Sequence, residues 1–138
     1  MPAKSRGADG EALLRNLERK VSRSLEGRGD VLQARHTGHW VSFRSRNLRR
    51  VFAELRAHER DVEIFLLPSP QELGSDGRVA AAPKTQGWGW FRSRLRLTKV
   101  TDLAQTQSLL LRSYEFRARM SREGGRRPRS PLAGGETR

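Results

Sequence analysis

Asp61-Val62-Glu63-Ile64-Phe65-Leu66-Leu67 is the stretch that decides the fold. Aliphatic side chains alternate with the other residues along it, which is the two-residue period of a β-strand. The composition is typical of strands, and Pro68 and Pro70 close the run. We therefore predict a strand over residues 61–67, in the centre of a sheet.

A second stretch with this period lies further along the chain. Residues 68–85 are rich in Pro, Gly, Ser and Ala, which predicts a long surface loop. In the following Gly87-Trp88-Gly89-Trp90-Phe91-Arg92-Ser93-Arg94-Leu95-Arg96-Leu97, apolar and small residues alternate with a series that contains three arginines. We expect a strand that packs through one face and presents Arg92, Arg94 and Arg96 on the other.

Two stretches before residue 61 also resemble strands. His39-Trp40-Val41-Ser42-Phe43-Arg44 has the composition of a strand. Val51–Ala57 is compatible with two structures, because its apolar residues alternate as in a strand, whereas Leu48, Phe52 and Leu55 have helical spacing. Periodicity leaves both interpretations open.

Helical patterns flank these strands. Between Glu11 and Gly27, leucines and Val21 recur at helical spacing and predict an amphipathic helix of about four turns. The turn that follows contains Arg28-Gly29-Asp30, which we interpret as a chance occurrence of an adhesion tripeptide. A second helix is predicted from Thr101 to about residue 119.

The two ends of the chain lack any apolar period. Residues 1–10 predict a disordered arm, and residues 120–138 predict a disordered basic tail. A single domain is therefore expected over residues 11–119. No stretch has the apolar length of a signal peptide or a membrane span, so we expect a cytoplasmic protein.

The composition favours polyanions as partners. The 138 residues carry 28 Lys and Arg against 15 Asp and Glu, a formal net charge of +13. All but four of the basic residues are arginines, so a GC-rich genome is an alternative explanation of the excess. The absence of cysteine from the sequence excludes disulfides, thiolate nucleophiles and zinc-finger sites.

Catalytic patterns are not found in the sequence. His36 and His39 are three residues apart but flank a turn-like Thr-Gly pair without a nearby carboxylate. Asp61 and Glu63 share one strand face, as in half of a nuclease site, but the lysine such a site needs is replaced by Phe65. We predict a protein that is not an enzyme and has no metal site or cofactor.

The order of these features resembles an uncharacterised bacterial domain, domain of unknown function 5655, often labelled "predicted transport protein". The similarity runs from Trp40-Val41-Ser42-Phe43-Arg44 through Gly87-Trp88-Gly89 to Ser113-Tyr114-Glu115, over roughly residues 36–118. It implies an α+β fold, with an antiparallel sheet of about four strands packed with an N-terminal and a C-terminal helix. It also implies that Val51–Ala57 is a strand. Members of this family occur beside nuclease-like domains, which suggests nucleic-acid transactions by analogy.

The leading hypothesis is a non-catalytic module that binds DNA or RNA through an arginine-rich strand face. Phosphates would contact the face, bases would stack on nearby tryptophans, and two further arginines would add attraction. The residues concerned are Arg92, Arg94, Arg96, Trp88, Trp90, Arg49 and Arg50.

The alternative is an intracellular small-molecule or protein-interaction domain whose basicity is compositional. Its pocket would be lined by Trp88, Trp90, Tyr114 and Trp40. Such aromatic residues are equally common in cores, and we expect Tyr114 to pack on the apolar face of its helix, with its hydroxyl bonded to a partner.

Overall fold

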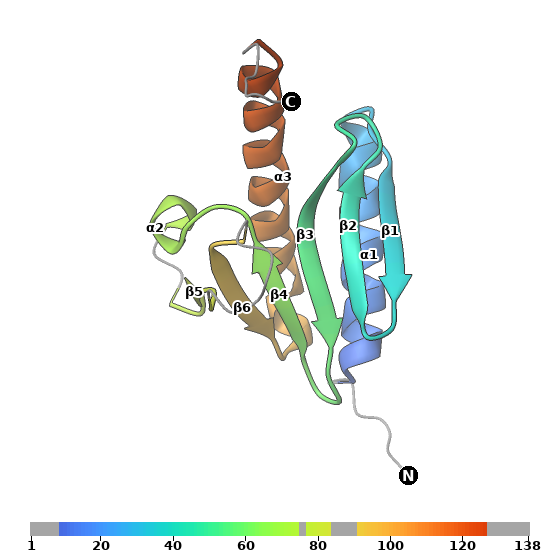
Figure 1. The fold of residues 1–138 in the computed structure, drawn as a ribbon. Coiled ribbons are helices and arrows are strands. Elements are labelled where there is room, and N and C mark those ends of the chain that lie inside the picture. Colours follow the sequence, from blue (N-terminus) through green and yellow to red (C-terminus); the bar gives the residue numbers. More distant parts are fainter. Residues whose placement is uncertain (1–8, 75–76, 84–90, 127–138) are drawn as a thin grey trace.

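The computed structural model describes residues 9–74, 77–83 and 91–126, and it has an α+β fold (Figure 1). Six antiparallel strands form one sheet in the order β1-β2-β3-β4-β6-β5. Their bounds are Leu32–Thr37 (β1), Trp40–Ser45 (β2), Arg50–Ala57 (β3), Val62–Leu66 (β4), Ala80–Ala81 (β5) and Ser93–Leu97 (β6).

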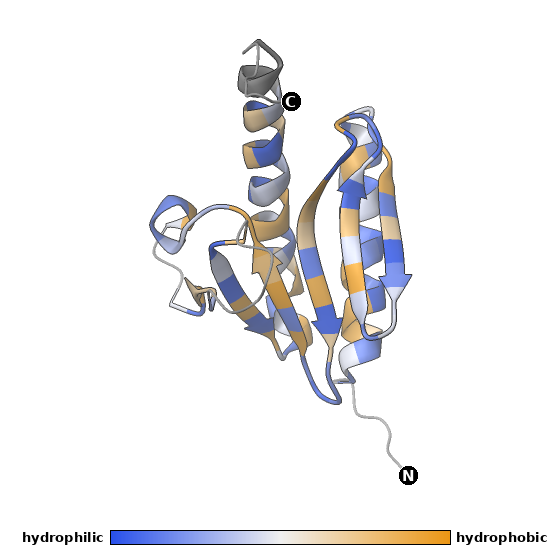
Figure 2. Ribbon diagram, in the orientation of Figure 1, coloured by the Kyte–Doolittle hydropathy of each residue, from blue (hydrophilic) through white to orange (hydrophobic). Residues whose placement is uncertain are grey.

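Two long helices cover one face of this sheet (Figure 1). They are α1, Gly10–Gly27, and α3, Leu103–Arg126. A short helix α2, Pro70–Leu73, follows β4, and a 3-10 turn η3, Val100–Asp102, precedes α3. Figure 2 shows apolar residues concentrated along the central strands and on the helix surfaces that face them. Among the described residues, no helix is long and apolar enough to cross a membrane.

The central strand is β4, as the sequence predicts. All of its residues are buried, and it pairs with β3 on one side and β6 on the other. The buried side chains from the strands and both helices form one core, to which α1 contributes four leucines and Val21. The predicted helix 11–27 and the strands at 39–44, 61–67 and 91–97 are thereby confirmed to within a few residues.

The ambiguous stretch 51–57 is a strand, but an irregular one. Phe43 pairs with Ala53 while the next residue, Arg44, pairs with Val51, so Phe52 is the extra residue of a β-bulge. The bulge lets Phe52 face the helices, where its ring lies 5.4 Å from that of Tyr114. The bulge interrupts the strict alternation of the strand. This explains why Leu48, Phe52 and Leu55 also have helical spacing in the sequence.

The prediction of about four strands is wrong, because β1 and β5 complete a sheet of six. Strand β1 lies at the sheet edge and only Leu32 and Ala34 in it pack against the core, so its sequence has too few apolar residues to show a period. Strand β5 has two residues and lies inside the predicted loop 68–85, which also contains α2. Such short segments have no detectable periodicity.

The predicted end of the second helix, near residue 119, is also wrong. Helix α3 continues to Arg126, so residues 120–126 are helical and are not part of a disordered tail. The last turns extend beyond the sheet (Figure 1), and a helix without a sheet to pack on needs no apolar period. The predictions for residues 1–8 and 127–138 lie outside the described residues.

Candidate functional site

The predicted arginine face of β6 is lined by acids from the neighbouring strand. In the β4–β6 ladder, Arg96 is opposite Glu63. The Arg96 Nη1 atom lies 3.0 Å from the Asp61 Oδ1 atom, and the Arg94 Nη1 atom lies 3.5 Å from the Glu63 Oε2 atom. These ion pairs offset two of the three predicted charges. The third residue, Arg92, precedes β6 and belongs to a different environment.

The rest of this sheet face is a mixed polar network. The His58 Nε2 atom lies 3.1 Å from Glu63, and Ser42 donates a hydrogen bond of 2.7 Å to Glu54. Burial raises the pKa of Glu54, against the lowering effect of the Ser42 hydrogen bond. The Arg56 guanidinium lies 5.4 Å from the Trp40 ring centroid. Carboxylates, a histidine and an aromatic ring thus share the surface with the arginines.

The histidine pair considered for metal binding is not a ligand set. His36 lies 3.5 Å from Glu18 of α1, and the exposed His39 lies in the β1–β2 turn. Within residues 9–74, 77–83 and 91–126, no group of three His, Asp or Glu side chains is placed to hold a metal ion.

The aromatic residues proposed for an alternative pocket do not converge where the structure describes them. Trp40 contacts Phe65, with ring centroids 5.7 Å apart, on the sheet face away from the helices. Tyr114 lies on α3, which covers the opposite face. Trp88 and Trp90 lie outside the described residues, so their predicted roles stay predictions.

The Ser113-Tyr114-Glu115 triplet of α3 holds the scaffold together. The buried Ser113 hydroxyl donates to the Phe52 carbonyl at 2.6 Å and accepts from the Leu67 N–H at 3.0 Å. Glu115 forms an ion pair of 2.8 Å with Arg28, which follows α1. Ser113 and Glu115 therefore tie α3 to other elements, so these two residues of the triplet have a structural role.

Tyr114, the middle residue of the triplet, contacts the buried Asp30. Its hydroxyl is bonded to a partner, as predicted from the sequence. Its hydroxyl donates to Asp30 at 2.9 Å, and Ser45 donates to the same carboxylate oxygen. Burial raises the pKa of Asp30, but these bonds and those from the Asn47 and Val31 N–H groups lower it below its ordinary value. With Asp30 only 2% exposed, the tripeptide at residues 28–30 cannot present that carboxylate to a receptor.

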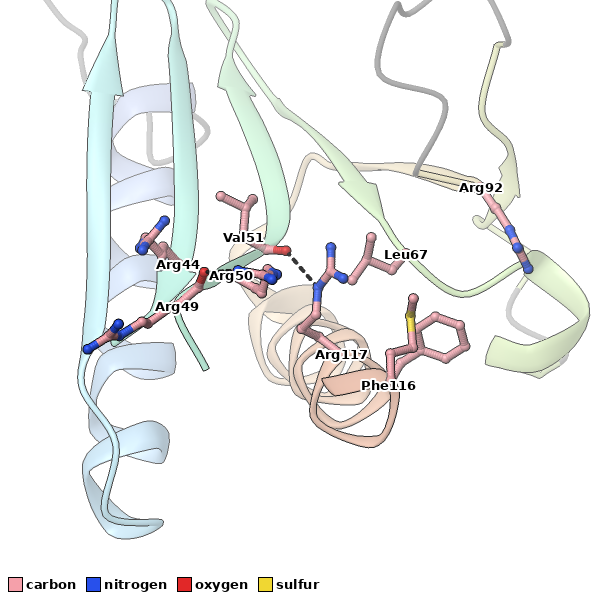
Figure 3. Close-up of a pocket in the computed structure, with 9 residues that line it drawn as sticks. Arg44, Arg49, Arg50, Val51, Leu67, Arg92, Phe116 and Arg117 are labelled. Atoms are coloured by element: carbon pink, nitrogen blue, oxygen red, sulfur yellow. Dashed lines mark hydrogen bonds between the residues drawn. The ribbon is translucent and has the colours of Figure 1, made fainter. Parts of the chain in front are cut away.

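The arginines that do converge line a pocket of about 570 Å³ where the β2–β3 hairpin, the end of β4 and α3 meet (Figure 3). We call it the arginine pocket. Five of its lining residues are basic: Arg44, Arg49, Arg50, Arg92 and Arg117. The other four are apolar: Val51, Leu67, Phe116 and Met120. No carboxylate is found among these nine residues.

Arg117 lies in the middle of this group. Figure 3 shows Arg44, Arg49 and Arg50 on one side of it and Arg92 on the other. Its Nε atom donates to the Val51 carbonyl at 3.3 Å, which holds the guanidinium against β3. Burial, and then the charge of Arg50, lower the pKa of Arg117. The half-buried guanidinium is thus in a position that disfavours its positive charge.

Arg49 has an unusual backbone conformation for its residue type. Its φ of 58° lies in the left-handed region, and no other non-glycine residue has a positive φ in the part of the chain that the structure describes. This conformation costs an L residue roughly 1–2 kcal/mol and is usual for glycine. An arginine at such a turn position, with its side chain at a pocket, is a candidate for selection on function.

Arg92 joins the pocket from the start of β6. Its N–H donates to the Leu66 carbonyl at 3.0 Å, and its carbonyl accepts from the Ala82 N–H at 2.9 Å. Its charge also acts on the exposed Glu72. The pKa of Glu72 is lowered first by its hydrogen bond with the Ser69 backbone, and further by the charges of Arg92 and Arg119.

The structure therefore brings together three of the predicted site residues, Arg49, Arg50 and Arg92, and separates them from Arg94 and Arg96. Arg44 and Arg117 were not among the site residues predicted from the sequence. Alternation along residues 39–44 could have placed Arg44 on the polar face of its strand. No sequence signal brings Arg117 to the same place, because it comes from the other end of the chain.

No family model, no curated protein and no solved structure gives a significant match to this chain. The resemblance to domain of unknown function 5655 thus stays a prediction.

Proposed function

We propose that this chain is a non-catalytic module that binds nucleic acid through its phosphates, at the arginine pocket. The observation that carries the proposal is the convergence of five arginines on one pocket, from the β2–β3 hairpin, the residue before β6 and α3, with no carboxylate among the nine described residues that line it. Arginine is well suited to phosphate, because its planar guanidinium donates two parallel hydrogen bonds to it.

The electrostatics of the pocket support an anionic ligand. Like charges held close together repel one another, and a half-buried guanidinium loses part of its hydration. For Arg117 both effects act together, from burial and from Arg50. A bound phosphate would offset them, whereas Arg94 and Arg96 already have protein carboxylates as partners.

The arrangement favours a polymer of phosphates over a single small anion. The arginines lie on both sides of Arg117, so they are spread across the pocket (Figure 3). A net charge of +13 adds long-range attraction for a polyanion. This role also agrees with the resemblance to a family found beside nuclease-like domains.

The test is fluorescence anisotropy with labelled oligonucleotides at low salt. The first variant changes the exposed pocket residues Arg44, Arg50 and Arg92 to Ser. The control changes three exposed arginines of α1, Arg15, Arg19 and Arg23, to Ser and removes the same charge. We expect binding by the wild type to weaken steeply with salt, and the pocket variant to lose far more affinity than the control.

Two results would contradict this proposal. The first is no binding of any oligonucleotide by the wild type at low salt. The second is an equal loss of affinity in both triple variants, which would mean that only net charge matters and that the pocket has no special part. Competition by a mononucleotide at equal phosphate concentration would instead favour the alternative, a small-molecule site.

A further inference from the structure

The apolar part of the arginine pocket is not explained by phosphate binding. Phe116 and Met120 are one helical turn apart on α3 and so lie on one face of it, and Val51 and Leu67 extend the apolar lining. Leu67 is buried, whereas Met120 is 42% exposed, one of two exposed large hydrophobic residues in the described part of the chain. A ligand with only phosphates would leave the exposed Met120 side chain in contact with water.

A nucleotide with an unstacked base would place an apolar surface against this lining. The base offers a flat apolar face, and base stacking on aromatic side chains is a common mode of single-strand binding. In a duplex the base faces are stacked on one another, so a duplex presents mainly phosphates to such a pocket. A volume of about 570 Å³ lies within the range of small-ligand sites and suits one nucleotide unit.

We propose that the arginine pocket binds single-stranded nucleic acid, with one unstacked base against Phe116 and Met120 and the adjoining phosphates on the arginines. This inference depends on the proposed function and narrows its ligand to one strand. The Arg119 guanidinium is not part of the lining, but it lies 5.6 Å from the Phe116 ring centroid and places a further positive charge beside the ring. Arg117, the residue after Phe116, is held against β3 by its hydrogen bond to the Val51 carbonyl.

The charge densities of single strands and duplexes allow a clear test of base contacts. A duplex has a higher linear charge density than a single strand, so a protein that reads phosphates alone binds the duplex at least as well. A preference for the single strand therefore requires contacts to the bases.

The experiment compares three labelled probes of equal length, about 12 nucleotides, within the usual range of single-strand sites. They are a mixed-sequence single strand, the same strand in a duplex, and a strand with abasic sites throughout its centre. Each is titrated by anisotropy at one salt concentration, about 50 mM. The proteins are the full chain, Met120→Ser, Phe116→Leu and the control Val100→Ser, which removes an exposed apolar side chain outside the pocket.

We expect the full chain to bind the single strand about tenfold more tightly than the duplex or the abasic strand. Met120→Ser and Phe116→Leu should each weaken single-strand binding by about threefold to tenfold and leave the other two probes unchanged. Val100→Ser should match the full chain with every probe. A circular dichroism melt of each variant checks that it is folded.

Two outcomes overturn the inference and leave the proposed function intact. One is equal binding of all three probes, which indicates phosphate contacts alone. The other is a single-strand preference that neither pocket variant reduces, which places the base contact elsewhere. Absence of binding to every probe contradicts the proposed function itself, so the two failures are distinguishable.

Discussion

Two groups of arginines on this chain differ in what surrounds them. Arg94 and Arg96 of β6 lie beside Asp61 and Glu63, which strand pairing brings next to them. The arginine pocket gathers five arginines, and none of its nine described lining residues is acidic. Alternation along a strand thus identifies which residues share a face. Whether their charge is neutralised depends on the neighbouring strand.

The two groups should therefore have opposite roles. An arginine paired with a protein carboxylate is partly neutralised and contributes to the network around it, although an exposed pair adds little stability. An arginine without such a partner contributes its charge to whatever binds. Variants of each group can therefore show whether the pocket arginines, and not those of β6, contribute to binding.

The largest effect is expected from removing two arginines of each kind. We expect Arg44→Ser with Arg50→Ser to weaken single-strand binding by between one and two orders of magnitude at low salt, because each lost phosphate contact costs about tenfold there. Arg94→Ser with Arg96→Ser should weaken it by less than about fivefold. Anisotropy titrations of both double variants check this, and a larger loss in the β6 variant would reverse the comparison.

Replacing Tyr114 tests whether the turn of α3 next to the pocket contributes to stability and not to binding. Tyr114→Phe removes the hydrogen bond to the buried Asp30 and should lower the free energy of unfolding by about 1–2 kcal/mol. Oligonucleotide affinity should be unchanged. Urea unfolding and anisotropy measure the two effects, and a loss of affinity without a loss of stability would move Tyr114 into the site.

The pKa of Tyr114 predicts the pH range over which its hydrogen bond to Asp30 stabilises the fold. Burial, the hydrogen bond to Asp30 and the Asp30 charge raise the pKa of this residue from 10.0 to about 12, against the effect of Arg28. The stabilisation is thus complete below pH 10 and is lost as pH rises towards 12. Tyr114 is the single tyrosine of the chain, so absorbance titration reports its ionisation directly. A midpoint near 10 would contradict the buried contact.

Arg49→Gly is expected to have the smallest effect on the fold and to separate stability from binding. Glycine adopts the φ of 58° without strain, so the variant should gain up to about 1 kcal/mol of stability. It should also bind the oligonucleotide several-fold more weakly, because a pocket charge is lost. Arg46→Gly, an exposed arginine of the same turn outside the pocket lining, is the control. Unchanged binding by Arg49→Gly would remove Arg49 from the site.

Strong local periodicity accounts for the parts of the fold that the sequence predicted. Strands β2 and β6 and the start of both long helices have clear apolar patterns because each buries one face or stripe, and β4 has one because all of its residues are buried. Strand β1 escaped prediction because an edge strand buries little. The last turns of α3 escaped because a helix beyond the sheet buries little as well.

The arginine pocket could not be predicted in the same way. Its residues come from β2, β3 and the turn between them, from the residues after β4 and before β6, and from α3. The bulge at Phe52 and the hydrogen bond from Ser113 to the Phe52 carbonyl are among the contacts that join β3 to α3 beside the pocket. These are contacts between distant segments, which no local period encodes. The number of arginines was visible in the sequence. It does not show that Arg94 and Arg96 have carboxylate partners while the described lining of the pocket contains none.

Nucleic acid is proposed to contact the arginines of the pocket and not those of β6. Side-chain NMR can follow the Nε–H resonances of these arginines in the labelled protein during titration with a single-stranded oligonucleotide. We predict that the resonances of Arg49, Arg50 and Arg117 shift with increasing ligand while those of Arg94 and Arg96 stay in place. Shifts of Arg94 and Arg96 with unchanged resonances of the pocket arginines would show that the nucleic acid binds at β6 instead.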